Sequence, residues 1–380
     1  MNDAIKFAST QLSDARLAVN ELKQNLSLDS YSLISVFYSA SYELEVLRDA
    51  LLVDFPNTEI VGCSTAGEIG AKGYSENSIS AVAFSKTSFQ ISVHRYDDLK
   101  NLSVIDWHDA TVKFHSEHNL KCGIQSDEST FGFLLIDGMS RREEPFTRIV
   151  SNAISGIPVV GGSAGDDLYF NTCPILHNSD IATDSAVLVL ITTPLPFRLY
   201  KTQNVLANEQ RMVVTGAIPE LRVITEINGF PAAEEYARIC NLNTVGELSS
   251  AVFAAHPVVV VMGDEQYVRS IQHVNPDHSL TFYCAIDQGM VMRLGTCTDL
   301  VESMDRTLTQ IAKDIGRLAC TVTFDCILRR LQLQEMGELE HMSKVLKSHN
   351  AIGFSTYGEQ FNGLHVNQTC AGIAIGAVDE

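Results

Sequence analysis

Apolar residues in the first half of the chain recur at spacings that are helical in some segments and strand-like in others. Leu12, Ala15, Ala18 and Leu22 are three or four positions apart, which predicts an amphipathic helix over Thr10–Leu28. Short apolar runs bounded by turn residues predict strands. On this reasoning we expect helices at Ser41–Leu52, Val104–His118 and Arg142–Ser155, strands at Ser32–Tyr38, before Val61, and at Phe131–Ile136, Pro158–Gly161 and Ala186–Thr192, and a hairpin of Ser78–Ser85 with Phe89–Tyr96.

The second half continues the same mixture. A strand at Leu221–Ile227 leads into the turn Asn228–Pro231 and a helix at Pro231–Cys240, with proline in its first turn. Turns are expected at Gly263-Asp264 and Asn275–Asp277. The remaining expected elements are strands at Pro257–Met262, Val268–Val274, Leu280–Ala285, Val291–Leu294, Thr321–Leu328, Ile352–Tyr357 and Thr369–Val378, and helices at Ser303–Ile315 and Arg329–Leu346.

Hairpins interrupt the early alternation of helices and strands. We therefore expect a mixed α/β (α+β) class, with mixed sheets flanked by helices, rather than a doubly wound sheet. Two domains are expected, because 380 residues suffice for two cores. The boundary is placed near residue 225, which gives domains 1–225 and 226–380.

A weak internal repeat links two segments of the first domain. Glu59–Glu68 and Ile157–Asp166 both read as an apolar strand, then glycine, a small residue, serine, and later alanine or glycine before an acid. This similarity predicts that the N-terminal domain is an internal duplication.

The charge balance narrows the class of partner. The chain carries 27 Lys and Arg against 46 Asp and Glu, a net charge of −19. A field of that sign repels phosphate backbones and anionic lipids, so we expect neither a nucleic acid nor a membrane partner. The start of the sequence resembles no signal peptide, and no apolar run reaches the ~18 residues of a membrane span. The expected location is cytoplasmic, and a homodimer is left open.

The pattern of cysteines and the lack of known catalytic motifs argue against an enzyme. Nine cysteines occur without a C-x-x-C pair, so neither a disulfide framework nor a zinc ribbon is expected. No G-x-S-x-G segment with an ordered triad is present. Cys63 follows Gly62 in a segment that reads as an exposed turn, which keeps a thiol-based enzyme or redox protein as a third hypothesis.

Three segments supply candidate ligand-binding residues, and two of them are glycine-rich turns that follow a predicted strand. Glycines after a strand let the backbone approach a ligand and present N–H groups to it. The alternative is that they only allow tight packing against a neighbouring strand. A third, polar segment joins two apolar strands near the end of the chain. The candidates are Gly62, Cys63, Ser64, Gly161, Gly162, Ser163, Glu359, His365, Asn367 and Thr369.

Six segments in this order resemble one family. The first three resemble a FIST N domain and the last three a FIST C domain, so the resemblance covers nearly the whole chain. It implies a sensory input module for signal transduction that binds a small ligand, with residues 1–225 as the FIST N-type domain and 226–380 as the FIST C-type domain. The segments are Val61–Ile69, Leu135–Gly138, Val160–Asp166, Asn228–Ala232, Phe324–Arg330 and Gly358–Thr369.

A two-domain chain of this length is similar to the haem-binding, nitric-oxide-sensing FIST proteins. That resemblance implies haem b as cofactor, nitric oxide as the signal, and a separate hybrid histidine kinase that feeds biofilm control as partner. Haem iron needs a donor, usually histidine, in an apolar pocket. His365 is the first candidate ligand of the iron and His256 the second, and Cys63 or Cys326 could replace either. Candidates for holding the propionates are Arg329, Arg330, Arg141 and Arg142.

The alternative within the family is a sensor of another small ligand, such as an amino acid. The glycine-rich turns and the arginine pairs would then hold its carboxylate.

Overall fold

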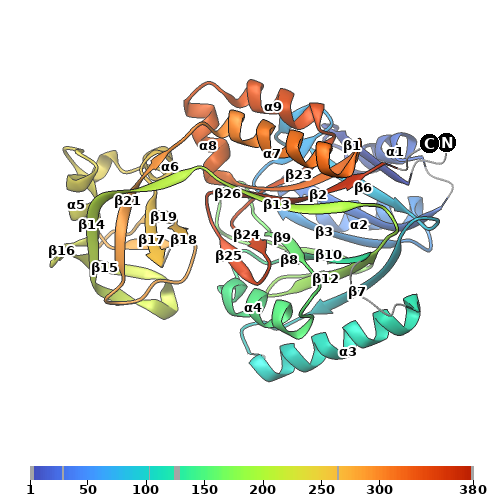
Figure 1. Cartoon of the computed structure of the whole chain (residues 1–380), viewed down its shortest axis with the longest axis horizontal. Helices are drawn as coiled ribbons and strands as arrows, with labels where there is room; N and C mark the ends of the chain where they lie inside the picture. Colours follow the sequence, from blue (N-terminus) through green and yellow to red (C-terminus); the bar gives the residue numbers. More distant parts are fainter. Residues whose placement is uncertain (1–3, 28–29, 102, 124–128, 263–264, 378–380) are drawn as a thin grey trace.

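The computed structural model describes residues 4–27, 30–101, 103–123, 129–262 and 265–377, and it has the mixed α+β class expected from the pattern. Figure 1 shows a larger body of sheets with helices on its outside, and a smaller lobe built from the middle of the chain. We call residues 205–297 the β lobe and the remainder the three-sheet body. The chain enters the β lobe after β13 (Phe197–Gln203) and leaves it before α7 (Leu300–Ile315).

The three-sheet body contains three six-stranded sheets with one common order of strands. In each sheet an edge strand is followed by two antiparallel neighbours, a strand parallel to the second of these, and a hairpin. The first sheet is β1 (Ile5–Thr10), β6 (Ile79–Ser85), β2 (Tyr31–Ser39), β3 (Glu59–Thr65), β10 (Ile175–His177) and β11 (Asp180–Ala182). The second is β7 (Gln90–Tyr96), β12 (Ala186–Thr192), β8 (Thr130–Ile136), β9 (Val159–Ser163), β24 (Glu359–Phe361) and β25 (Leu364–Val366). The third is β13, β26 (Thr369–Gly376), β22 (Leu318–Cys326), β23 (Ala351–Thr356), β4 (Glu68–Gly70) and β5 (Gly73–Ser75).

The internal repeat is threefold. β3 and β9, which carry the two similar segments of the sequence, hold equivalent places in the first two sheets, and β23 holds that place in the third. The repeats also exchange hairpins. The hairpin that follows β3 pairs with β23, the one that follows β9 pairs with β3, and the one that follows β23 pairs with β9. Of the third repeat, β22, β23 and β26 lie beyond residue 225 and β13 lies before it, so the two halves of the chain share their sheets.

The centre of the core is an aromatic triangle with one ring from each sheet. Phe37 of β2, Phe133 of β8 and Phe324 of β22 have ring centroids 5.3 to 6.4 Å apart. All three are at most 4% exposed. Equivalent strands of the three repeats therefore meet at one point, where aromatic burial contributes most to stability.

Helices cover the outer faces of these sheets, and several start at a side-chain cap. Asp14 accepts a hydrogen bond from the Leu17 amide, and Ser103 forms a capping box with Asp106. No helix of the described part of the chain is long and apolar enough to cross a membrane. The helices of this body are α1 (Ala15–Asn25), α2 (Leu44–Asp54), α3 (Val104–Cys122), α4 (Glu143–Ala153), α7, α8 (Ile327–Glu335) and α9 (Leu339–Ser348).

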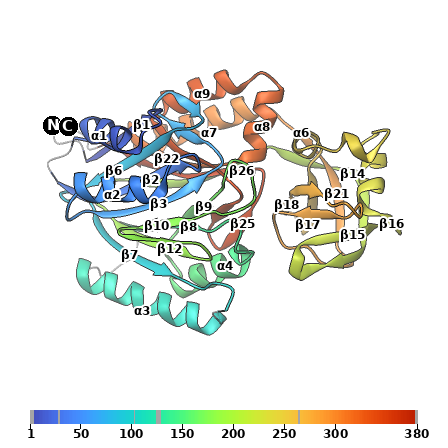
Figure 2. The ribbon, with the colours of Figure 1, turned by 180° about the vertical axis from the view of Figure 1, so that it is seen from behind.

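The β lobe has a sheet and an apolar core of its own. Figure 2 shows it beside the three-sheet body when the molecule is seen from behind. The predicted boundary near residue 225 falls inside β15, which pairs with β14 and β20. Its elements are β14 (Val205–Ile218), η2 (Pro219–Leu221), β15 (Val223–Ile227), β16 (Phe230–Pro231), α5 (Ala232–Ile239), η3 (Val245–Glu247), α6 (Ser250–Ala255), β17 (Val258–Met262), β18 (Glu265–Arg269), β19 (Ile271–Val274), β20 (Leu280–Phe282) and β21 (Val291–Cys297).

Several expected elements differ in the structure, among them the strand expected at Val268–Val274, which is divided between β18 and β19. The hairpin of Ser78–Ser85 with Phe89–Tyr96 does not form, because β6 pairs with β1 and β2 while β7 pairs with β12 in another sheet. The apolar pattern predicts each strand but cannot show its distant partner. The single helix expected over Arg329–Leu346 is two helices, since Gly337 takes a φ of 73° after the end of α8.

The start of the chain also differs, since Ile5–Thr10 forms β1 and the first helix begins only at Ala15. The turn expected at Gly263-Asp264 and the last residue of the strand expected at Thr369–Val378 lie outside the described residues.

Candidate functional site

A cavity of about 790 Å³ lies between the three-sheet body and the β lobe. The start of α4, the turn before it and the β24–β25 hairpin form one side. The other side comes from β-lobe residues near η2, in β18 and around β21. Its lining is rich in cations, although the whole chain is strongly acidic. The basic residues are Lys100, Arg141, Arg142, Arg148, Arg222 and Arg269, and the acidic ones are Glu144, Glu220 and Asp287.

His365 lies in the wall of this cavity, on β25. It is 5% exposed, its Nδ1 lies 3.3 Å from Nε2 of Gln360, and its Nε2 has no hydrogen-bond partner among the described residues. Burial, together with the charges of Arg222 and Arg269, lowers the pKa of His365 to about 3. The imidazole is therefore neutral at physiological pH. Its Nε2 is buried and lies against Gly358, where a Cβ would stand 2.7 Å from this nitrogen.

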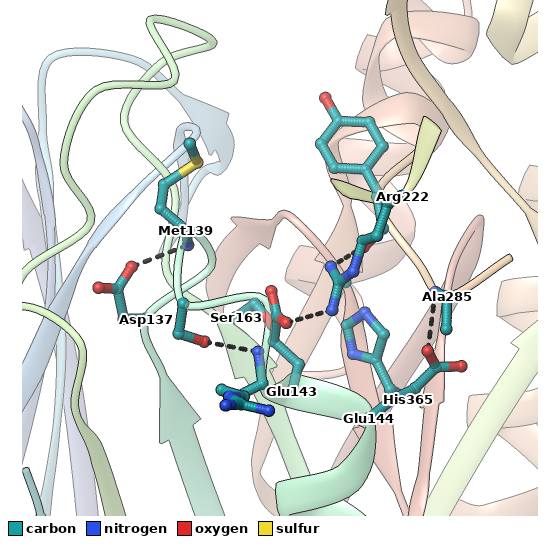
Figure 3. A network of polar contacts seen from close by, with 12 residues as sticks. Asp137, Met139, Glu143, Glu144, Ser163, Arg222, Ala285 and His365 are labelled. Carbon is teal, nitrogen blue, oxygen red and sulfur yellow. Dashed lines mark hydrogen bonds and ion pairs between the residues drawn. The ribbon is translucent and has the colours of Figure 1, made fainter. Parts of the chain in front are cut away.

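The guanidinium of Arg222, a residue of the β lobe, places a buried positive charge next to His365. Its Nη2 donates to Oε2 of Glu143 at 2.6 Å and its Nη1 to the Tyr283 carbonyl at 2.5 Å. Arg222 also has a φ of 57°, a left-handed conformation that is unusual for a residue with a long side chain. Figure 3 shows its guanidinium beside the imidazole of His365.

Glu144 makes the second connection between the two parts of the chain. Its Oε1 lies 3.3 Å from Nη1 of Arg269, and its Oε2 accepts from the Ala285 amide at 2.7 Å. Figure 3 shows this carboxylate next to His365, on the side away from Glu143. Two consecutive acids at the start of α4 therefore hold two arginines of the β lobe.

The remaining cations lie on the three-sheet body. Arg142, half-buried, donates to the Lys100 carbonyl at 2.6 Å. Arg141 and Arg148 are exposed and form no ion pair within the described residues. The structure thus brings the predicted Arg141 and Arg142 to the same cavity as His365, where Arg141 and Arg148 are open to a ligand while Arg222 and Arg269 are paired with glutamates.

The other predicted cofactor residues lie elsewhere. Arg329 is 1% exposed and bonds to Asp325 at 2.6 Å and to Asn204 at 2.8 Å. Arg330 bonds to Glu76 and to a backbone carbonyl. Because protein groups already neutralise both guanidinium groups, neither arginine is free to hold a propionate at His365. His256 ends α6, is half-buried, and does not line the cavity.

The two glycine-rich segments lie inside strands. A Cβ on Gly62 would stand 2.3 Å from the Val36 carbonyl oxygen, and one on Gly161 would stand 1.9 Å from that of Leu134. These glycines allow neighbouring strands to approach closely. Their neighbours Gly162, Ser64 and Ser163 are buried as well. The cavity lining includes none of the six candidates from these two segments.

Cys63 is not in an exposed turn. It lies within β3, its side chain is fully buried, and burial raises its pKa well above the ordinary value for a thiol. Cys326 is also buried, with its pKa raised for the same reason. Neither sulfur is available as a thiolate at neutral pH, which removes the basis for a thiol-based reaction at Cys63.

Glu359 and Thr369 belong to a structural network. Glu359 is fully buried and accepts hydrogen bonds from the hydroxyls of Thr356 and Thr369, and burial raises its pKa to about 8. Glu68 occupies the equivalent place in the first repeat, with a pKa raised by burial to about 7. Glu68 therefore holds the β4–β5 hairpin in place, and Glu359 holds the β24–β25 hairpin. Asn367 is 1% exposed, and its side-chain polar atoms have no partner among the described residues.

Sequence reasoning missed several residues of the cavity. Glu143 and Glu144 directly follow the predicted arginine pair, so the run of four charges at 141–144 was a usable signal. Arg222 and Arg269 carry no such signal, because only the folding of the β lobe brings them to α4. The other missed cations are Lys100 and Arg148.

Comparison with known proteins shows two family domains in succession, whose junction falls inside the β lobe. The model of the FIST N domain matches residues 32–229, and that of the FIST C domain matches residues 232–362. An uncharacterized protein of Methanocaldococcus jannaschii is 23% identical over 227 residues, which cover 57% of this chain and 42% of that protein. The chain thus spans less than half of this relative. FIST domains are sensory domains that bind small ligands. The chain belongs to the FIST family, with a FIST N domain followed by a FIST C domain.

Proposed function

We propose that this protein is a signalling sensor that binds an anionic small ligand in the cavity at His365. The observation that carries the proposal is a buried, neutral histidine in a cavity lined by six basic and three acidic side chains, in a protein of net charge −19. Clustered cations in a concave, partly dry site attract anions far more strongly than the same charges spread over a surface.

Haem b is the first ligand to test. The ring nitrogen of His365 that lacks a protein partner is the kind of donor that haem iron requires. The exposed guanidinium groups of Arg141 and Arg148 suit two propionates. Haem would supply the iron at which nitric oxide is detected. His365 would donate to the iron only if its buried Nε2, which lies against Gly358, turned toward the cavity, and Arg141 and Arg148 would hold the propionates.

The test for haem is the absorption spectrum of the purified protein after haem b is added. A Soret band that shifts on addition of nitric oxide, and that is weakened in a H365A variant, supports haem sensing. A protein that stays colourless rejects haem as the ligand. H256A is the matched control, because His256 lies outside the cavity lining.

A second candidate is an anionic metabolite such as an amino acid. This candidate is favoured by Arg222 and Arg269, the two arginines next to His365, since guanidinium groups bind carboxylates with two parallel hydrogen bonds. Thermal-shift screening separates it from haem, because a ligand that binds only the folded state raises the melting temperature.

The proposed partner is a separate hybrid histidine kinase, on the basis of the family resemblance. Co-purification of the kinase with this protein, and a change in its autophosphorylation when ligand is added, would support that role. Kinase activity that is unchanged at saturating ligand would reject it.

A further inference from the structure

The two chain crossings between the β lobe and the three-sheet body lie side by side. Asn204 precedes the lobe and Thr298 follows it, and the Thr298 amide donates to the Asn204 carbonyl at 2.8 Å. The side chain of Asn204 donates to the Asp299 carbonyl at 3.1 Å and accepts from Arg329 at 2.8 Å. Because Arg329 is itself held by Asp325, both crossings are fixed at one point. The lobe also contacts the body through α6, which packs on α8, and through Tyr283, whose ring lies 5.7 Å from that of Tyr357.

On the cavity side, Glu143 and Glu144 connect the lobe to α4. Glu143 pairs with Arg222, and Glu144 pairs with Arg269 and accepts from the Ala285 amide. Arg222 and Arg269 both line the cavity. The two carboxylates therefore occupy the same guanidinium groups that an incoming anion would use. Arg222 also keeps an unusual left-handed backbone, a conformation that persists only when its surroundings hold it.

We propose that Glu143 and Glu144 compete with the anionic ligand for Arg222 and Arg269, and that their ion pairs act as a latch for the β lobe. This inference rests on the proposed function, since it assumes that the cavity binds an anion. When ligand carboxylates take Arg222 and Arg269, Glu143 and Glu144 lose these two ion pairs and the connection between α4 and the lobe is weakened, while Glu144 keeps its hydrogen bond from the Ala285 amide. The competition is reciprocal, so weakening the latch strengthens ligand binding by the same factor.

The test compares the wild-type protein with an E143Q/E144Q variant. Citrate, a tricarboxylate, and haem b are the two probes, and binding is measured by calorimetry and by absorption. The variant should bind at least one probe roughly five- to tenfold more tightly. Without any probe, the amides of residues 205–297 that face α4 should exchange hydrogen faster than in the wild type. E340Q removes an exposed pair with Lys344 on α9 and is the matched control.

The outcomes separate the two proposals. If a probe binds the wild type and the variant equally, or binds the variant more weakly, the competitor role is wrong while the ligand cavity stands. If neither probe binds either protein, the proposed function fails and the competitor role fails with it. Should the double variant not fold, E144Q alone keeps the buried Glu143–Arg222 pair and should still bind roughly two- to threefold more tightly.

Discussion

Nη2 of Arg222 in the β lobe lies 2.6 Å from Oε2 of Glu143 on α4, and both side chains are almost fully buried. Removing one partner of a buried pair leaves the other charge uncompensated. We expect R222M to lower the free energy of unfolding by about 3 kcal/mol, measured by urea denaturation.

The companion variants make this prediction specific. E143Q/R222M should recover part of the loss, because no buried charge is left without a partner. R238M removes a pair in which the arginine is 68% exposed and should cost much less than R222M, because solvent screens an exposed pair. A loss in R222M as small as that in R238M would contradict the buried pair.

The aromatic triangle predicts a large effect from one ring. Phe133 contacts both Phe37 and Phe324, so F133A leaves a cavity where the three sheets meet. We expect a loss of about 3–5 kcal/mol, again from urea denaturation. F230A removes a ring that is 59% exposed and should change stability by at most about 0.5 kcal/mol. Equal losses in the two variants would show that the triangle is not the centre of the core.

The raised pKa of Glu359 predicts a decline in stability with rising pH. Between pH 4.5, the ordinary pKa of a glutamate, and about 8, the folded protein holds a proton that the unfolded chain has released. Stability is therefore full below the unfolded pKa and is lost as the pH rises through the folded one. E359Q should flatten this slope in thermal unfolding measured from pH 5 to 8. The exposed E340Q is the control, and an unchanged slope in E359Q would contradict the raised pKa.

His365 predicts the opposite slope at lower pH. Its pKa is lowered from 6.5 to about 3, so the unfolded chain binds a proton in that range which the folded protein refuses. Its contribution destabilises the fold progressively as the pH falls from 6.5 toward 3. H365Q should reduce this loss, whereas H108Q, at an exposed histidine, should not. If both variants keep the wild-type acid slope, His365 is protonated in the folded state.

The mixed class and most strands could be predicted from the sequence, because they depend on local apolar periodicity. Two of the three repeats could be predicted from similar segments, whereas the third, around β23, could not. The exchange of hairpins between the three sheets could not be predicted from the sequence. The residues around Glu68 read as one more turn and strand, and nothing in their pattern shows that they pair with β23, almost three hundred residues later. The same limit explains the hairpin wrongly expected between Ser78–Ser85 and Phe89–Tyr96.

The site was predictable only in part. His365 and the pair Arg141-Arg142 stand in conspicuous polar segments, and the structure brings them to one cavity. Arg329-Arg330 is an equally conspicuous pair, but burial against Asp325 and Glu76 gives it a structural role. Sequence alone cannot separate the two cases, because the acids that neutralise an arginine can come from anywhere in the chain.

The most direct measurement is a calorimetric titration of the purified protein with anionic ligands, haem b, citrate and glutamate among them. It compares the wild type with R141Q/R148Q, in which two exposed cations of the cavity are removed, and with R306Q, at an exposed arginine of α7. At least one anion should bind the wild type and R306Q alike, and bind R141Q/R148Q roughly tenfold or more weakly. Binding that is equally strong in all three proteins, or no binding of any anion to the wild type, would contradict an anion-sensing cavity at His365.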